Sequence, residues 1–395
     1  MSPLPLLLAA VMAHGIGQTI VFAVLAPLGR DVGLREIEVG LIIAASSLVF
    51  SWASPRWGRA SERIGRRRTL IIGLLGYTLG TTVFATGFLA GMQGWLTGGA
   101  LLAALVLARM FQSTLMAAAP PATTAYMADI TSVEQRAGGM GKLSAAHNVG
   151  TIVGPALGGL MAVFGLLAPL YGAALVTLVT AFFVWRYLPE SPHHAHIAAQ
   201  PPSPAGHLPG YLDPRVFPFM VLGVSLYVAF SVIQQTLGFF IQDKLQVDTR
   251  ETARLVGMAL MVCAAASLAM QAIAVRRQWR ARLLLWSGFP LIMAGSVVLF
   301  FASDAWFVAA AMVLVGAGTG LAAPGYTAAA SMAVSAREQG AVAGLVASAP
   351  ALGYIVGPLA GTALYQLDPH APHIFVAVSC LPLLIYLHRL GRTLP

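Results

Sequence analysis

Apolar stretches long enough to cross a lipid bilayer recur along the whole of this chain, and no other feature limits its fold so strongly. A membrane-spanning helix needs about 20 consecutive, mostly apolar residues, and the sequence of 395 residues contains twelve such stretches. The strands of a membrane barrel instead alternate apolar and polar residues over about ten positions. Only 9% of the residues are charged and 58% are hydrophobic, which is far from the composition of a water-soluble protein. The sequence therefore predicts an all-α membrane protein with twelve transmembrane helices.

The expected spans follow one another at short intervals. They are residues 4–28, 39–57, 70–92, 99–127, 143–164, 168–188, 216–240, 255–275, 283–301, 306–332, 342–365 and 374–390. The first span has no basic segment before it and no convincing small-residue cleavage site after it. We therefore expect it to stay in place as a helix rather than to be removed as a signal peptide.

A segment rich in Pro, Gly and His, residues 189–215, divides the chain into two halves with six spans each. The halves share a pattern at an offset of 203 residues, which aligns Pro121 with Pro324 and Gly154-Pro155 with Gly357-Pro358. A repeat of this kind predicts two pseudo-symmetric six-helix bundles, residues 1–188 and 216–395, joined by a cytoplasmic linker. The four linker histidines lack cysteine and clustered carboxylate neighbours, so we expect a solvated linker and no metal site.

The basic residues are concentrated on one side of the expected membrane. With both termini placed inside, 17 of the 23 Lys and Arg residues fall on the cytoplasmic side. This distribution fits the positive-inside rule and predicts that both termini are cytoplasmic. The formal net charge of +9 thus serves topology, and we expect no nucleic-acid partner.

Residues 58–68, GRASERIGRRR, place a dense cationic cluster between the second and third spans. The segment resembles the signature loop of the major facilitator superfamily, which runs Gly, Asp, Arg, Gly, Arg and a further basic residue at matching intervals. The matching residues here are Gly58, Glu62, Arg63, Gly65, Arg66 and Arg67. Glu62 stands where the family usually has Asp. The resemblance implies that these residues form a latch that holds one conformation of a transporter, and topological anchoring alone is the alternative.

Arg109 lies inside the fourth span, roughly 14 Å along the helix at a rise of about 1.5 Å per residue. A guanidinium at this depth costs at least about 2.5 kcal/mol, so it needs a partner or a wet cavity. The stretch RMFQS, with Gln112 and Ser113, resembles the Arg-x-x-Gln-Gly motif of the drug:proton antiporter branch of the family, with Ser in place of Gly. The resemblance implies a role in proton coupling; a packing arginine bonded to carbonyl oxygens is the alternative.

The fifth span carries glycines at every fourth position, Gly150, Gly154 and Gly158, with Pro155 beside the middle one. Such a stripe lets another helix approach closely, and the proline offers a kink. The pattern resembles the antiporter signature of the same branch. It returns in the second half at Gly353, Gly357 and Gly361, so close helix packing explains part of it.

Polar side chains inside the spans are few, and they are expected to point inward. The candidates for a substrate cavity are Gln18, Gln112, His147, Asn148, Gln234, Gln235, Tyr326 and Tyr354. No carboxylate lies deep in any span. The imidazole of histidine has an intrinsic pKa near neutrality, so His14 is the first candidate beside Arg109 for moving protons, and a hydrogen-bonded structural histidine is the alternative. Asp31 is the second candidate.

The two repeats predict transport by alternating access. The resemblance to the antiporter branch implies a proton-coupled exporter in a bacterial inner membrane, and we expect it to work as a monomer on small amphipathic molecules, such as a drug, a metabolite or a siderophore. A facilitator or proton symporter that imports a neutral solute is the alternative. Sequence signatures of enzymes, including Gly-x-Ser-x-Gly and phosphate-binding loops, do not occur, so we expect neither catalysis nor a cofactor.

Overall fold

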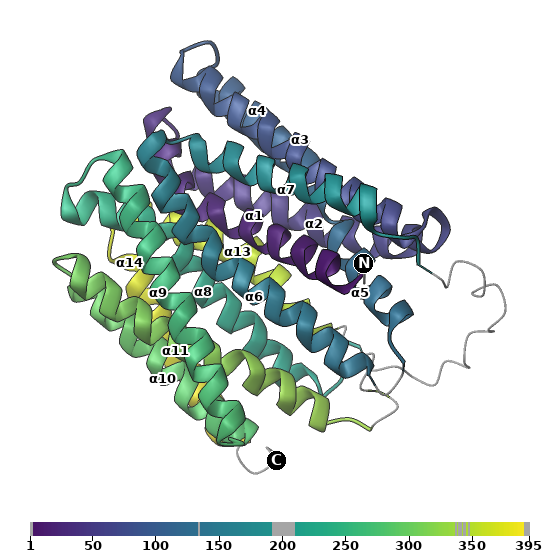
Figure 1. Ribbon diagram of the computed structural model, residues 1–395. Coiled ribbons are helices and arrows are strands. Elements are labelled where there is room, and N and C mark those ends of the chain that lie inside the picture. The colour runs from purple at the N-terminus through teal and green to yellow at the C-terminus, as the bar shows by residue number, and fades with distance from the viewer. Residues whose placement is uncertain are drawn as a thin grey trace. The chain divides into compact units, whose positions relative to one another are not determined.

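A computed structural model shows a chain built from α-helices, and the residues that it describes contain no strand (Figure 1). The described residues are 3–132, 135–191, 210–335, 338, 342, 345–346 and 348–390. The helices are α1 (Leu4–Asp31), α2 (Glu36–Ile64), α3 (Arg66–Met92), α4 (Gly98–Met116), α5 (Ala119–Ile130), α6 (Arg136–Met161), α7 (Ala168–Tyr187), α8 (Phe217–Leu245), α9 (Thr249–Arg276), α10 (Ala281–Phe301), α11 (Ala305–Met332), α13 (Ala349–Leu367) and α14 (Ala371–Leu390). Each of the twelve predicted spans contains a helix, so the predicted all-α membrane fold is confirmed. The four linker histidines lie outside the described residues.

The chain divides into two compact units. The first comprises Met1–Pro202 with Thr249–Gly257, and the second comprises Ser203–Asp248 with Met258–Pro395. In the first unit α1 packs against α6 and α7, while α3 packs against α4 and α7. In the second unit α8 packs against α13 and α11, and α10 packs against α11 and α14. The pairs α1–α6 and α8–α13 occupy equivalent places in the two halves of the sequence.

The fourth predicted span is broken into two helices. Helix α4 ends at Met116 and α5 begins at Ala119. Pro120 and Pro121 follow directly, in the first turn of α5. Proline has no backbone N–H and is tolerated in the first turn of a helix, where that N–H would lack a partner. The two prolines therefore set the start of a new helix within one transmembrane passage.

The cationic segment predicted as a loop is almost entirely helical. Helix α2 continues to Ile64 and α3 begins at Arg66, so that Gly65 alone connects them. Gly65 has φ +104°, a backbone conformation that side-chain-bearing residues rarely adopt. The predicted span 39–57 is shorter than α2 because charged residues follow it, whereas the helix itself continues beyond the bilayer into water.

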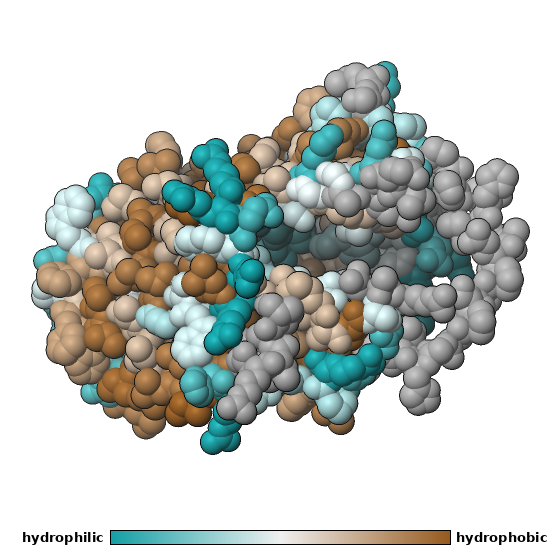
Figure 2. Space-filling view, turned by 90° about the horizontal axis from the view of Figure 1, so that it is seen from below, coloured by the Kyte–Doolittle hydropathy of each residue, from teal (hydrophilic) through white to brown (hydrophobic). Residues whose placement is uncertain are grey.

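Eleven stretches of the described chain are long and apolar enough to cross a membrane. Large hydrophobic side chains lie openly on their outer faces, as lipid contact requires; Leu107 is 64% exposed and Trp52 58% exposed. Figure 2 shows one such face, on which hydrophobic side chains (brown) cover broad areas of the surface. The two cysteines, Cys263 on α9 and Cys380 on α14, are instead buried, and neither forms a disulfide.

Candidate functional site

The exposure pattern along α4 turns Arg109 toward the interior of the first unit. Leu107 and Phe111 are 64% and 44% exposed, whereas Arg109 is 6% exposed. Gln112 and Ser113, one turn further on, are fully buried. Residues three and four apart share a helix face, so these three polar side chains form an inward stripe and the hydrophobic ones face lipid.

Side chains from two helices surround Arg109. Its Nη1 donates a hydrogen bond to Oε1 of Gln112, and Nε2 of Gln112 donates in turn to the hydroxyl of Thr81 on α3. The guanidinium carbon lies 5.5 Å from the ring centroid of Phe84. Gly80 makes room for this arrangement, because a methyl group there would lie 2.4 Å from Cβ of Gln112. The glycine thus lets α3 approach the polar stripe of α4.

No carboxylate of the described residues pairs with Arg109. The described acidic residues all lie in connections or within three residues of a helix end. They are Asp31, Glu36, Glu38, Glu62, Asp129, Glu190, Asp213, Asp243, Asp248, Glu251, Asp304, Glu338 and Asp368. The guanidinium Nε is buried without a hydrogen-bond partner. Arg109 is therefore a buried cation whose charge the described chain leaves uncompensated.

His14 and His147 come together where α1 meets α6. His14 is 5% exposed, and its Nε2 is buried without a partner. A methyl group at Gly15 would lie 2.8 Å from the carbonyl oxygen of His147 and 3.3 Å from its Nδ1, so the two helices touch at this level. One turn further along α1, the carbonyl of Gly17 accepts a hydrogen bond of 2.7 Å from the hydroxyl of Tyr77 on α3. The helices α1, α3 and α6 thus bring polar groups to the same interior.

The remaining candidates of the first half lie in different surroundings. Gln18 follows His14 by one turn of α1 and is half-buried, and Asn148 is half-buried on α6. Asp31 is the last residue of α1 and is exposed. It is close in sequence to the ion pair of Arg30 and Glu36, whose side chains are 2.9 Å apart. The structure thus places Asp31 at one end of the bundle, near the helix terminus rather than in the polar interior.

In the second unit, α8 and α13 bring two predicted cavity residues into contact. The hydroxyl of Tyr354 donates a hydrogen bond of 2.6 Å to Oε1 of Gln234. Gln235 is buried, and its Oε1 has no hydrogen-bond partner. Tyr326 on α11 donates a hydrogen bond to the carbonyl oxygen of Val346 at 3.3 Å, and its ring packs edge-on against that of Tyr227.

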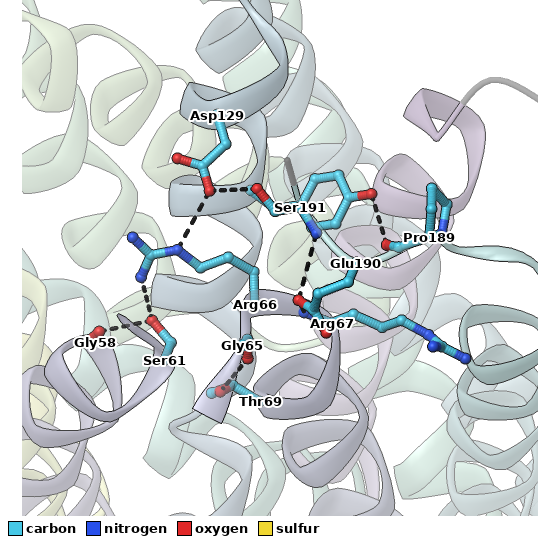
Figure 3. A network of polar contacts seen from close by, with 11 residues as sticks. Gly58, Ser61, Gly65, Arg66, Arg67, Thr69, Asp129, Pro189, Glu190 and Ser191 are labelled. Atoms are coloured by element: carbon cyan, nitrogen blue, oxygen red, sulfur yellow. Dashed lines mark hydrogen bonds and ion pairs between the residues drawn. The ribbon is translucent and has the colours of Figure 1, made fainter. Parts of the chain in front are cut away.

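The predicted latch contains a polar network at one end of the first unit (Figure 3). Arg66 Nε lies 3.4 Å from Oδ2 of Asp129 at the end of α5, and the same oxygen accepts a hydrogen bond of 2.6 Å from Ser191. Arg66 also donates to the hydroxyl of Ser61, which donates at 2.6 Å to the carbonyl of Gly58. The network therefore ties the junction of α2 and α3 to the ends of α5 and α7.

A second group of hydrogen bonds joins the amino end of α3 and α5 to the residues at the end of α7. The N–H of Arg67 donates to Oε1 of Glu190 at 2.9 Å, and the guanidinium of Arg67 donates to the carbonyl of Trp185. The hydroxyl of Tyr126 donates to the carbonyl of Pro189 at 2.8 Å. A carboxylate at the first turn of a helix is stabilised by the helix dipole. Glu190 thus caps the amino end of α3 from the end of α7.

Glu62 and Arg63 are exposed and lie outside this network, whereas Gly58, Gly65, Arg66 and Arg67 belong to it or border it. The acidic groups of the network are Asp129 and Glu190. Glu190 lies in the segment predicted as the linker, residues 189–215, and Asp129 lies just beyond the end of the predicted span 99–127. A signal for both was present, because the ends of α5 and α7 lie on the same side of the expected membrane as the cationic cluster.

The glycine stripe of α6 packs against α1. A methyl group at Gly150 would lie 2.3 Å from the carbonyl oxygen of Met12, and one at Gly154 would lie 2.2 Å from the hydroxyl oxygen of Thr19. At Gly158 the nearest atom, in Ile20, would be 3.0 Å away. Helix α6 keeps its helical conformation past Pro155. The stripe thus joins two helices at nearly backbone-to-backbone distance.

The second unit repeats this seam between α13 and α8. Methyl groups at Gly353 and Gly357 would lie 2.4 Å from Cβ of Tyr227 and 1.7 Å from the hydroxyl oxygen of Ser231. Ser231 donates to the carbonyl oxygen of Gly353 at 3.0 Å. Within the described residues, no three His, Cys, Asp or Glu side chains gather as metal ligands. The polar side chains described above are instead suited to binding a ligand through hydrogen bonds and through the single fixed cation of Arg109.

Comparison with known proteins points to a single family. The family model of the Major Facilitator Superfamily matches residues 7–349 and, in a second match, residues 277–394. The chain is 25% identical to Multidrug resistance protein 2 of Bacillus subtilis (strain 168), with 94% of this chain and 90% of that protein aligned. It is 28% identical to the class C Tetracycline resistance protein of Escherichia coli, with 91% and 88% aligned.

Among solved structures, a bacterial homologue of the human lysosomal transporter Spinster, in an inward-facing and occupied conformation, superposes with a TM-score of 0.78. It is 12% identical to this chain, and the match covers 100% of this chain and 98% of that one. A bacterial homologue of the iron transporter ferroportin gives a TM-score of 0.74 at 14% identity, over 98% of this chain and 99% of that one. These likenesses concern the fold.

Proposed function

Because the chain belongs to the Major Facilitator Superfamily, we propose that it is a secondary active transporter that exports small amphipathic molecules in exchange for protons. The observation that carries the proposal is the buried Arg109 at mid-span, 6% exposed and without a carboxylate partner among the described residues. Ionisable residues within membrane spans mark substrate or ion pathways. The curated relatives are named for resistance to multiple drugs and to tetracycline, which supports export over import.

Transport would proceed by alternating access of two bundles, residues 1–188 and 216–395, joined by the linker 189–215. Rocking of one repeat against the other around a central site is the mechanism that such repeats support. In this proposal the contacts of Arg66 and Arg67 with Asp129 and Glu190 act as the latch, and they release when the transporter changes conformation. The glycine seams between α1 and α6 and between α8 and α13 keep each bundle internally stiff.

Proton coupling would use Arg109 together with groups that titrate. An arginine does not release its proton in a protein, so Arg109 acts through its fixed charge. His14, buried beside α6, is the first candidate for the proton carrier, because imidazole exchanges protons near neutral pH. Asp31 is the second candidate. The substrate would contact Gln18, Gln112, His147 and Asn148 in the first bundle and Gln234, Gln235, Tyr326 and Tyr354 in the second.

Collapse of the proton gradient tests this proposal. Bacterial cells expressing the protein are loaded with tetracycline, and the intracellular drug is followed before and after a protonophore is added. We expect lower accumulation than in cells without the protein, and a rise to their level once the gradient is gone. Faster entry and exit with the same final accumulation as control cells, with or without the protonophore, would indicate a facilitator, and gradient-driven uptake would indicate a symporter.

A substitution links the same assay to Arg109. In everted vesicles that hold a proton gradient, addition of a substrate should release protons through the wild-type protein. We expect Arg109→Ala to abolish this release, whereas Arg68→Ala, at an exposed position of α3, should retain it. Equal proton release by both variants would remove Arg109 from the coupling mechanism.

We further propose that the protein acts as a monomer in a bacterial inner membrane, with both termini in the cytoplasm. The excess of basic residues on one side supports this orientation. Reporter fusions settle the question: alkaline phosphatase, which is active only outside the cytoplasm, should be inactive when fused to the carboxyl end. An active fusion would reverse the orientation.

A further inference from the structure

The positive charge of Arg109 has no negatively charged partner within the part of the chain that the structure describes. Its guanidinium has five N–H donors, and the described residues provide one hydrogen-bond acceptor for them, Oε1 of Gln112. The neighbours Thr81, Tyr77 and Phe84 carry no negative charge. Of the fourteen acidic residues, thirteen lie in the described residues, and all of these are found in connections or near helix ends.

Two further buried polar atoms in the helices of the first unit are also unsatisfied. Oγ of Ser113 on α4 and Nε2 of His14 on α1 are buried without hydrogen-bond partners, as is Nε of Arg109. Buried polar atoms in native proteins nearly always have partners, and each exception calls for an explanation. Three exceptions within the membrane-spanning helices of one unit, one of them on a cation, indicate a site whose partners come from a ligand.

The chemistry of the missing partner follows from the donor set. A guanidinium binds carboxylate with two parallel charge-assisted hydrogen bonds, and such bonds are about twice as strong as neutral ones. A single arginine balances a single negative charge, so a second charge on the ligand would remain buried and unpaired. Phe84, with its ring centroid 5.5 Å from the guanidinium carbon, adds an apolar surface next to the charged group.

From these observations we propose that the substrate is an amphipathic monoanion, such as an organic acid with one carboxylate, and that its anionic group binds to Arg109. This inference rests on the proposed transport function and specifies its substrate class. It disfavours cationic substrates, because a buried cation is bound by carboxylates, and the described spans hold none away from their ends.

A binding experiment with matched probes tests the charge preference. The full-length protein in lipid nanodiscs is titrated near neutral pH with phenylbutyrate, phenylbutanamide and phenylbutylammonium, which share one skeleton and are anionic, neutral and cationic. We expect the wild-type protein to bind the acid at least tenfold more tightly than the amide, a difference of about 1.4 kcal/mol, and to bind the ammonium compound most weakly.

Three variants assign the preference to Arg109. Arg109→Gln removes the charge and should lower the affinity for the acid to that for the amide. Arg109→Lys keeps the charge and should keep the acid ahead of the amide. Arg68→Gln removes an exposed arginine from α3 and should leave the preference unchanged. The thermal unfolding curve of each variant shows whether it is folded.

The proposal is overturned if the wild-type protein binds the amide as tightly as the acid, if it does not bind the acid at all, or if folded Arg109→Gln retains the preference. Export of the same three probes from cells separates this result from the transport function itself. Gradient-dependent export of the ammonium compound but not of the acid would refute the monoanion proposal and leave the exporter proposal in place. Absence of export for all three probes, together with tight binding of the acid, would refute the exporter proposal and leave the binding of a monoanion at Arg109 in place.

Discussion

The glycine seam between α1 and α6 leads to a prediction with a built-in control. Gly150 and Gly141 lie on the same helix, α6, and differ in their surroundings. A methyl group at Gly150 would lie 2.3 Å from the carbonyl oxygen of Met12, whereas one at Gly141 would meet nothing within 4 Å. Both substitutions by alanine gain about 1 kcal/mol of intrinsic helix propensity, so the difference between them isolates the contact with α1.

The size of that difference follows from the geometry. An ordinary contact of a Cβ atom begins at 3.4 Å, so Gly150→Ala requires the helices to separate by about 1 Å at this point. Adding one methyl group to a well-packed interior costs about 1–3 kcal/mol, and the upper end applies because the neighbour is backbone and cannot rotate away. We expect Gly150→Ala to be less stable than Gly141→Ala by about 2–3 kcal/mol.

Thermal unfolding in detergent, followed by tryptophan fluorescence, measures the effect. The melting temperature of Gly141→Ala should equal or exceed that of the wild-type protein, and that of Gly150→Ala should be clearly lower. Equal melting temperatures for the two variants would show that α1 and α6 are not in direct contact at Gly150. The inferred function of the glycine stripe as a packing seam would then be wrong.

Three further predictions concern single groups. Replacing Glu190 by Gln weakens the acceptor for the backbone N–H of Arg67, so that amide should exchange with deuterium roughly tenfold faster, the equivalent of about 1.4 kcal/mol; an unchanged rate would show that the carboxylate charge does not hold the junction of α2 and α3. The guanidinium of Arg215, which donates to Glu338 at 2.8 Å and 3.2 Å, lowers the pKa of that carboxyl from 4.5 to about 2. Because this pKa is depressed, the ion pair stabilises the folded protein fully above pH 4.5, and the stabilisation is lost as the pH falls toward 2. In Arg215→Gln the carboxyl carbon of Glu338, followed by NMR, should titrate closer to 4.5. A midpoint still near 2 would refute the assignment of the shift to Arg215. Replacing His14 by Asn should flatten the pH dependence of export while leaving the amount of protein in the membrane unchanged, and an unaltered pH profile would make His14 a structural residue.

The fold was predictable because hydrophobic length is a global property of each segment. Every one of the twelve expected spans holds a helix, since a chain in hydrocarbon must satisfy its backbone hydrogen bonds internally. The ends of the helices were harder to predict, because hydrophobic length marks where the bilayer ends and not where the helix ends. Residues 58–64 are charged, yet they continue α2, because a helix does not end where the bilayer ends.

The candidate site could be predicted where a residue is energetically costly at its position in the membrane. Arg109 stands out because an arginine at mid-span is rare, and its burial and its bond to Gln112 agree with the predicted inward direction. The partners of the latch were harder to find. Asp129 and Glu190 are ordinary acids at helix ends in the sequence, and only the packing of α5 and α7 beside α3 brings them to Arg66 and Arg67.

The burial of both native cysteines has a practical consequence for the study of motion. Cys263 is 3% exposed and Cys380 is 1% exposed, and the chain has no other cysteine. A thiol introduced by mutation at an aqueous position is thus the one that a membrane-impermeant maleimide reaches first in the otherwise native chain. Spin labels or fluorophores can therefore be attached to the first unit without changing the second, and the movement of each labelled position can be followed in an otherwise native chain.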